Sequence, residues 1–157
     1  MIDSKNENYK KLILAAKNEE DLIIFSMLCQ DSIIKISNIK WAKKSKRFFI
    51  LLTRFCWELN YLSKKKSSSL RRVNSILSFD NVLSVKTLGI KQKRSNMITS
   101  LLTCNYRSRS FEEQSIDLVF SGNGKITLDI ECIEVFIKDI SEPFKSTYSK
   151  PPNHEHE

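Results

Sequence analysis

The sequence is poor in glycine, proline and histidine. Its 157 residues include three glycines, three prolines and two histidines. So little glycine and proline excludes collagen-like and low-complexity classes of protein. Both histidines, His154 and His156, lie in the polar C-terminal stretch PPNHEHE, so the commonest general base is missing from the rest of the chain. We expect these two residues to lie in a frayed tail, and we favour this interpretation over a metal site.

Motifs that carry nucleotide or hydrolytic chemistry are missing too. The chain has no P-loop, G-x-S-x-G, H-E-x-x-H or G-x-G-x-x-G pattern. Asp129, Glu131 and Glu134 form an acidic group that a metal could use, but the acidic start of a helix explains them more simply. Glu58 lies four residues after Arg54, which predicts a structural ion pair in preference to a catalytic carboxylate. The sequence therefore favours a protein without enzymatic activity, cofactor or metal, and a small enzyme is the least favoured alternative.

The four cysteines, Cys29, Cys56, Cys104 and Cys132, are too far apart to form a C-x-x-C pair. This spacing excludes a zinc or thioredoxin-type site. Each cysteine lies in an apolar stretch, which predicts buried and reduced thiols. The N-terminal MIDSKNENYKK lacks the apolar core of a signal peptide, and the apolar runs are too short to span a bilayer. We expect a cytoplasmic protein with no transmembrane segment.

Apolar residues make up 41% of the chain and charged residues 28%, which allows a substantial core and excludes a mostly disordered protein. A length of 157 residues suits one domain. No internal repeat or dividing linker is visible. We expect a single α+β domain over residues 9–145, with residues 1–8 and 146–157 as flexible tails.

The net charge of +8 is unevenly distributed. Residues 1–34 hold 4 basic and 6 acidic side chains, a net of −2. Residues 35–109 hold 18 basic and 2 acidic ones, a net of +16, and residues 110–157 hold 4 and 10, a net of −6. Such a central segment could attract nucleic acid, an acidic protein or an anionic membrane surface. Ordinary solvated surface is the simpler interpretation, and no partner is identified by charge alone.

The candidate phosphate- or anion-binding residues are Lys64, Lys65, Lys66, Arg71 and Arg72, in a Ser- and Lys-rich segment without apolar periodicity. We expect this segment to be a flexible loop. Six further cations lie in two other predicted loops: Lys43, Lys44, Lys46, Lys91, Lys93 and Arg94. If these loops gathered at one end of a sheet, they could contact several phosphates.

A helix is predicted after Asn18, a favourable N-cap, because three acidic residues follow it and apolar residues continue to about Gln30. Strand-like patterns recur in the segments 12–14, 34–41, 47–58, 77–87, 102–106, 116–120 and 126–130. The first half of segment 47–58 is apolar on both faces, which predicts a central strand. Residues 122–124, Gly-Asn-Gly, predict a tight hairpin. Apolar residues at spacings of 3, 3, 1 and 3 over residues 130–140 predict an amphipathic helix, with Asp129 as its cap.

These elements predict a mostly antiparallel, curled sheet of about seven strands, with an N-terminal helix and a closing C-terminal helix. This order is similar to that of a pleckstrin-homology-like barrel, an analogy of fold alone. An open antiparallel sheet with both helices on one face is the alternative.

Three segments resemble one known family: F-x-G-x-G-x-I-x-L-D-I-E-C-I-E at residues 120–134, R-F-x-W-E at 54–58 and F-D-x-V at 79–82. The family is uncharacterised, mainly alphaproteobacterial, and numbered 2948 among the domains of unknown function. The resemblance covers residues 12–144 and implies no activity, cofactor or catalytic residue. We therefore expect a non-catalytic cytoplasmic binding or adaptor domain of unknown role. An electrostatic nucleic-acid binder is the alternative.

Overall fold

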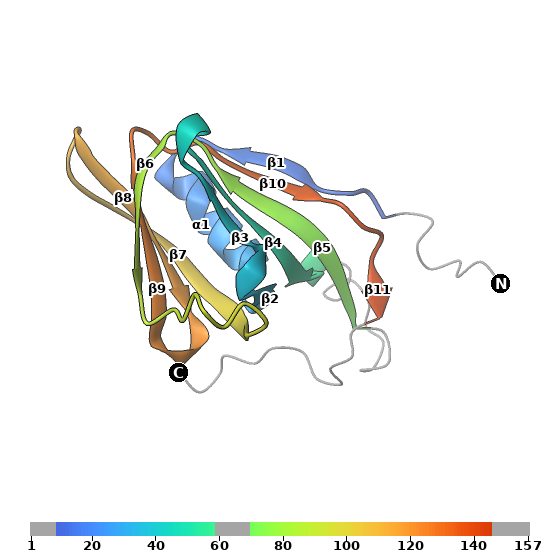
Figure 1. The fold of residues 1–157 in the computed structure, drawn as a ribbon. Coiled ribbons are helices and arrows are strands. Elements are labelled where there is room, and N and C mark those ends of the chain that lie inside the picture. Colours follow the sequence, from blue (N-terminus) through green and yellow to red (C-terminus); the bar gives the residue numbers. More distant parts are fainter. Residues whose placement is uncertain (1–8, 59–69, 146–157) are drawn as a thin grey trace.

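The computed structural model describes residues 9–58 and 70–145 of the chain. This part is a strongly curled antiparallel sheet that holds one α-helix in its hollow (Figure 1). The elements in chain order are β1 (Ile13–Ala16), α1 (Glu19–Cys29), β2 (Ser32–Lys35), β3 (Ile39–Ala42), β4 (Arg47–Phe55), β5 (Arg71–Phe79), β6 (Val82–Leu88), β7 (Ile98–Ser110), β8 (Glu113–Phe120), β9 (Gly124–Ile130), β10 (Val135–Asp139) and β11 (Phe144–Lys145). In these residues no helix has the length and apolar character that crossing a membrane requires.

The strands lie in the order β1-β10-β5-β4-β2-β7-β8-β9-β6, and β3 and β11 pair with β4 and β5. All pairs are antiparallel, so the predicted α+β class with a curled antiparallel sheet is confirmed. The predicted count of about seven strands is wrong, because the sheet has eleven. The predicted segments 34–41 and 77–87 each cover parts of two strands, β2 with β3 and β5 with β6, and β10 and β11 lie in segments not predicted as strands.

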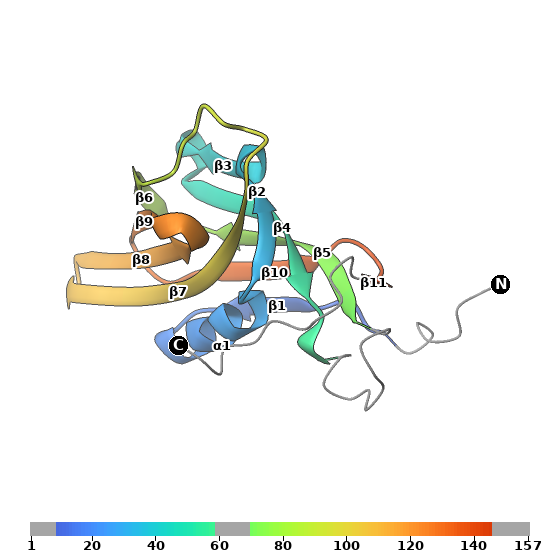
Figure 2. The ribbon, with the colours of Figure 1, turned by 90° about the horizontal axis from the view of Figure 1, so that it is seen from below.

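The core lies on the inner, concave face of the sheet. Strand alternation sends Phe48, Ile50 and Leu52 of β4 inward, and each is at most 2% exposed. The helix α1 covers part of this face, lying beside β7 and β1 with Leu22 and Phe25 buried (Figure 2). Its predicted cap is confirmed, because the side chain of Asn18 accepts a hydrogen bond of 2.8 Å from the Asp21 N–H.

The predicted C-terminal helix over residues 130–140 is wrong. The second half of this segment is strand β10, which lies between β1 and β5 and pairs with both. Val135, Ile137 and Asp139 alternate inward, a period of two that the spacing of the apolar residues also allows. Pairing on two sides satisfies the backbone of β10, and its β-branched residues suit a strand. Asp129 lies on β9 and caps no helix.

The sheet curls until its last strand, β6, faces β3, but these two strands do not pair. In the described residues, backbone hydrogen bonds connect only the segments that flank this gap. At one end the Val82 N–H donates to the carbonyl of Lys46, at 2.8 Å. At the other end the N–H groups of Ile36 and Ser37 donate to the carbonyls of Met97 and Ser95, at 2.9 and 3.0 Å. We call the unpaired gap between β3 and β6 the seam.

The seam decides between the two predicted architectures. A closed, pleckstrin-homology-like barrel is wrong for the described residues, because β1 and β6 both remain edges and no closing helix follows β10. The open antiparallel sheet is confirmed, with one helix where two were predicted. Closure depends on contacts between residues about forty positions apart, which local sequence patterns do not report.

The predicted hairpin at residues 122–124 is confirmed, because Gly122 and Asn123 both have positive φ, at 76° and 65°, between β8 and β9. Gly89 also has a positive φ, at 70°, and lies against this turn. A Cβ atom at Gly89 would stand 2.7 Å from the Asn123 carbonyl oxygen. This close approach holds the start of the loop 89–97 against the β8–β9 hairpin.

Candidate functional site

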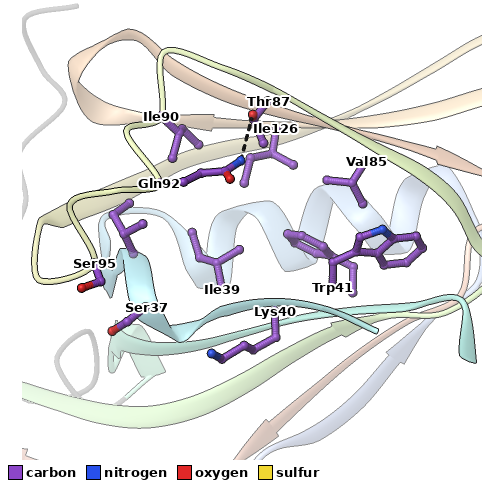
Figure 3. A pocket seen from close by; sticks show the side chains of 12 residues that line it. Ser37, Ile39, Lys40, Trp41, Val85, Thr87, Ile90, Gln92, Ser95 and Ile126 are labelled. Carbon is purple, nitrogen blue, oxygen red and sulfur yellow. Dashed lines mark hydrogen bonds between the residues drawn. The ribbon is translucent and has the colours of Figure 1, made fainter. Parts of the chain in front are cut away.

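The seam opens into a cavity of about 430 Å³, lined largely by apolar side chains (Figure 3). Strands β3 and β6 form its two sides, and the loop 89–97 closes one end. Twelve residues line it: Ile36, Ser37, Ile39, Lys40, Trp41, Phe48, Val85, Thr87, Ile90, Gln92, Ser95 and Ile126.

Strand alternation explains why apolar side chains face the cavity. Ile39 and Trp41 are two residues apart on β3 and share one face, and Val85 projects from β6 on the opposite side. Phe48 of β4 and Ile126 of β9 form the floor, and both belong to the buried core. The cavity is therefore continuous with the core and accessible at the seam.

The two ends of the cavity differ in polarity. Trp41 and Val85 lie together at one end, and Ser37, Gln92 and Ser95 lie at the other (Figure 3). At the polar end the Gln92 side-chain amide donates a hydrogen bond of 3.4 Å to Thr87. Such an arrangement, with an apolar body and a few polar groups at one end, is typical of a small-molecule site.

A separate polar cluster lies in the core at the far end of β4. Arg54 is fully buried, and its guanidinium forms ion pairs with Asp139 at 3.0 Å and with Glu58 at 2.6 Å. The predicted pairing of Arg54 with Glu58 is therefore confirmed. Asp139 is a partner of Arg54 that the sequence did not predict. The sequence predicts a helix over residues 130–140, and only the strand β10 turns the Asp139 side chain toward the core.

Asp139 accepts further hydrogen bonds from three directions. The Ser75 hydroxyl donates at 2.6 Å, the Leu12 N–H at 2.9 Å and the Tyr9 hydroxyl at short range. Burial by itself raises the pKa of Asp139, but the hydrogen bonds from Arg54 and these three donors outweigh it and lower the pKa below its ordinary value. None of these residues lines the cavity, so this cluster fixes the fold and takes no part in the candidate site.

These carboxylates make stability depend on pH. Burial raises the pKa of Glu58 as well, but the hydrogen bond from Arg54 leaves it below its ordinary value. Stability from a lowered carboxylate pKa is present above the unfolded-state pKa, about 4, and is lost as pH falls through the folded-state value. We expect the urea midpoint to be constant from about pH 7 to about pH 5 and to fall below about pH 4. The fall should be smaller in Asp139→Asn, and an equal fall in both proteins would contradict this assignment.

The predicted anion-binding residues are not brought together in the described residues. Lys64, Lys65 and Lys66 lie outside them. The prediction that Arg71 and Arg72 belong to a loop is wrong, because both begin strand β5. Arg72 is 7% exposed, donates hydrogen bonds to the carbonyls of Asp31 and Thr53 at 3.3 Å, and lies over the Phe55 ring.

The two other basic loops lie at opposite ends of the seam. Residues 43–46 follow β3 and contact the start of β6, and residues 91–94 follow β6 and lie near the start of β3. They do not form one continuous phosphate-binding surface, which the nucleic-acid hypothesis requires.

The acidic group of Asp129, Glu131 and Glu134 is divided among separate partners. Asp129 accepts a short hydrogen bond from Ser84, Glu131 pairs with Lys46 at 2.9 Å, and Glu134 accepts one of 2.6 Å from the Asn81 side chain. The described residues contain no cluster of three side chains suited to a metal.

No cysteine forms a disulfide. Cys29, Cys56 and Cys104 are buried as predicted, but Cys132 is exposed, so the prediction is wrong for that residue. Burial raises the pKa of Cys29 to about 12, which keeps its thiol protonated at neutral pH.

The model of a family described as a protein of unknown function (DUF2948) matches residues 12–154. No curated protein and no solved structure matches the chain significantly.

Proposed function

The chain belongs to the DUF2948 family of proteins of unknown function, and we propose that it is a non-catalytic binding domain that holds a small, largely apolar molecule in the seam cavity. The observation that carries this proposal is the unpaired seam, which gives solvent access to an apolar cavity of about 430 Å³. Small-molecule sites commonly enclose about 300–1,000 Å³ and are lined mainly by apolar and aromatic side chains.

The character of the lining supports a binding role. The lining contains no histidine, cysteine, aspartate or glutamate, and Lys40 is its one charged residue. Burial of an apolar ligand against Trp41, Phe48 and Val85 is favourable because apolar surface is removed from water. The facing edges of β3 and β6 can also offer unpaired backbone N–H and C=O groups to a ligand.

We further propose a cytoplasmic location, which is supported by four cysteines without a disulfide. The alternative function, an electrostatic nucleic-acid or anionic-surface binder, uses the candidate residues Lys64, Lys65, Lys66, Arg71 and Arg72. Its support is the charge of the central segment. The buried position of Arg72 weakens it.

A neutral amphiphile tests the binding function. We expect decanol to change the fluorescence of Trp41, and Trp41→Phe assigns the signal because Trp57 is the one other tryptophan. Val85→Phe should weaken decanol binding about tenfold or more, because the larger ring occupies the cavity.

The matched control for this test is Leu83→Phe. Leu83 is two residues away on the same strand, is 46% exposed and does not line the cavity, so binding should be unchanged. Equal decanol binding by the wild-type protein and Val85→Phe, with both folded by circular dichroism, would overturn the proposed function.

A further inference from the structure

We infer that the ligand of the seam cavity is an amphipathic anion, with its apolar body at the Trp41 end and its negatively charged group at the Ser95 end. This inference rests on the proposed binding function and names the chemical class of the ligand. It is carried by three observations: the charge of the cavity walls, the cations without an ion pair beside the polar lining, and the polarity of the lining.

Both sides of the seam come from segments of the chain that contain no acidic residue. The first, residues 32–57, includes β3 and β4, and the second, residues 81–111, includes β6 and the loop 89–97. Together they hold thirteen lysines and arginines and no aspartate or glutamate. Five of these cations form ion pairs with acidic residues of other segments, and the other eight have none among the described residues. The remaining positive charge around the cavity favours an anion over a cation or a neutral molecule.

The cations at the polar end are available to a ligand. Lys91, Lys93 and Arg94 flank the lining residues Gln92 and Ser95 in the loop 89–97, and all three are exposed. None of them has an ion pair within the described part of the chain, and the same is true of Lys40.

Elsewhere on the two walls some surface cations are already paired, whereas Lys35, Lys43, Lys44 and Arg109 have no ion pair among the described residues. Lys46 contacts Glu131 at 2.9 Å, and Lys86 contacts Asp129 at 3.4 Å. The cations that stay without an acidic partner include those closest in sequence to the polar lining. An anionic group at this end would be attracted to several positive charges. It would not have to displace an acidic side chain from them.

The lining itself offers hydrogen-bond donors at the same end. The hydroxyls of Ser37 and Ser95 make no hydrogen bond among the described residues, and both lie at the polar end in Figure 3. A carboxylate or sulfate oxygen accepts such bonds, and a charged acceptor strengthens them. The opposite end, beside Trp41 and Val85, offers mainly apolar surface to the remainder of the ligand.

Three probes with the same ten-carbon chain test this inference: decanoate, decanol and decyltrimethylammonium, each followed by Trp41 fluorescence. At low salt we expect decanoate to bind about tenfold more tightly than decanol, and the cation to bind most weakly. The advantage of decanoate should shrink as salt increases, because counterions screen the exposed cations.

Charge variants locate the anionic group. The triple variant Lys91→Gln, Lys93→Gln and Arg94→Gln should lower decanoate affinity to about that of decanol and leave decanol binding unchanged. The matched control, Lys43→Gln with Lys44→Gln, removes two cations from the opposite end of the seam and should change neither affinity. Equal loss of decanoate binding in both variants would overturn the assignment of the anion to the Ser95 end.

The outcomes separate the inference from the function on which it rests. If decanol and decanoate bind with equal affinity, and Val85→Phe weakens both, the cavity is a binding site and the inference is wrong. If neither probe binds, the proposed function fails, and the inference fails with it.

A vesicle experiment separates a free amphiphile from a bilayer surface, which presents the same chemistry. We expect monomeric decanoate to compete with the vesicles for the cavity of the wild-type protein, and Val85→Phe to abolish that competition. Equal sedimentation of wild-type protein and Val85→Phe with phosphatidylglycerol vesicles, together with no binding of monomeric decanoate, would overturn the inference in favour of surface attraction.

Discussion

Asp139→Ala is expected to lower the free energy of unfolding by about 3–5 kcal/mol, because it leaves a buried arginine without its buried partner. Arg54 and Asp139 are 0% and 2% exposed, and two guanidinium nitrogens contact the carboxylate at 3.0 and 3.1 Å. Glu58 still pairs with Arg54 in the variant, which places the loss toward the lower end of the range.

The loss extends beyond the ion pair. The Ser75 hydroxyl and the Leu12 N–H both donate to Asp139 and would lose that acceptor. An unsatisfied buried donor costs about 1–3 kcal/mol. Since Tyr9 and Leu12 precede β1, the variant should also loosen the docking of β1 against β10.

Urea denaturation followed by circular dichroism measures this effect, with Asp80→Ala as the control. Asp80 pairs with Arg47 at 2.7 Å on the surface, where the arginine is 55% exposed, so its loss should cost no more than about 1 kcal/mol. If Asp139→Ala does not fold, Ser75→Ala is the milder variant, with an expected loss of about 1–2 kcal/mol. Similar midpoints for Asp139→Ala and Asp80→Ala would show that the buried cluster is not a determinant of stability.

Phe48→Ala should have the second large effect, a loss of about 3–5 kcal/mol. Phe48 is 2% exposed, packs against Phe79 at a ring-centroid distance of 6.2 Å, and forms part of the cavity floor. Its removal deletes a buried aromatic side chain in the centre of the sheet, and neighbouring strands on both sides restrict the relaxation that could fill the space.

Phe49→Ala is the matched control, because it removes the same side chain one position further along β4. Phe49 pairs with Ser78 and Lys40 and lies on the outer, partly exposed face of the sheet. Its loss should cost about 1 kcal/mol, since much of its surface remains in water. Equal losses for the two variants in urea denaturation would contradict the assignment of inner and outer faces.

This pair of phenylalanines also shows how far the sequence could be interpreted. Residues 48–52 are apolar at every position, which correctly predicts a central strand, and β4 indeed pairs on both sides. The same run does not reveal which face is buried. Leu51 is 37% exposed although its neighbours Ile50 and Leu52 are buried, because burial depends on what the rest of the chain places over each face.

The prediction of a helix over residues 130–140 is wrong for a related reason. Its apolar residues satisfy both a helical and a strand period, and a local pattern cannot choose between them. The choice is made by the space between β1 and β5, which a strand fills by hydrogen bonding on both sides.

The sequence by itself determined the features that depend on a few neighbouring residues. The Asn18 cap, the hairpin at residues 122–124, the ion pair of Arg54 with Glu58 and most of the alternating strands are set by local backbone geometry and short spacings. The acid-free character of both seam walls can also be read from the sequence.

Only the tertiary structure decided which distant residues meet. Arg54 and Asp139 are 85 positions apart, and the two sides of the seam come from β3 and β6, more than forty residues apart in the chain. Whether those strands pair or leave a gap depends on the curl of the whole sheet, which is a sum of twists and packing contacts along nine strands. The candidate site exists because the curl of the sheet does not bring β3 and β6 into pairing, and no local sequence pattern encodes that curl.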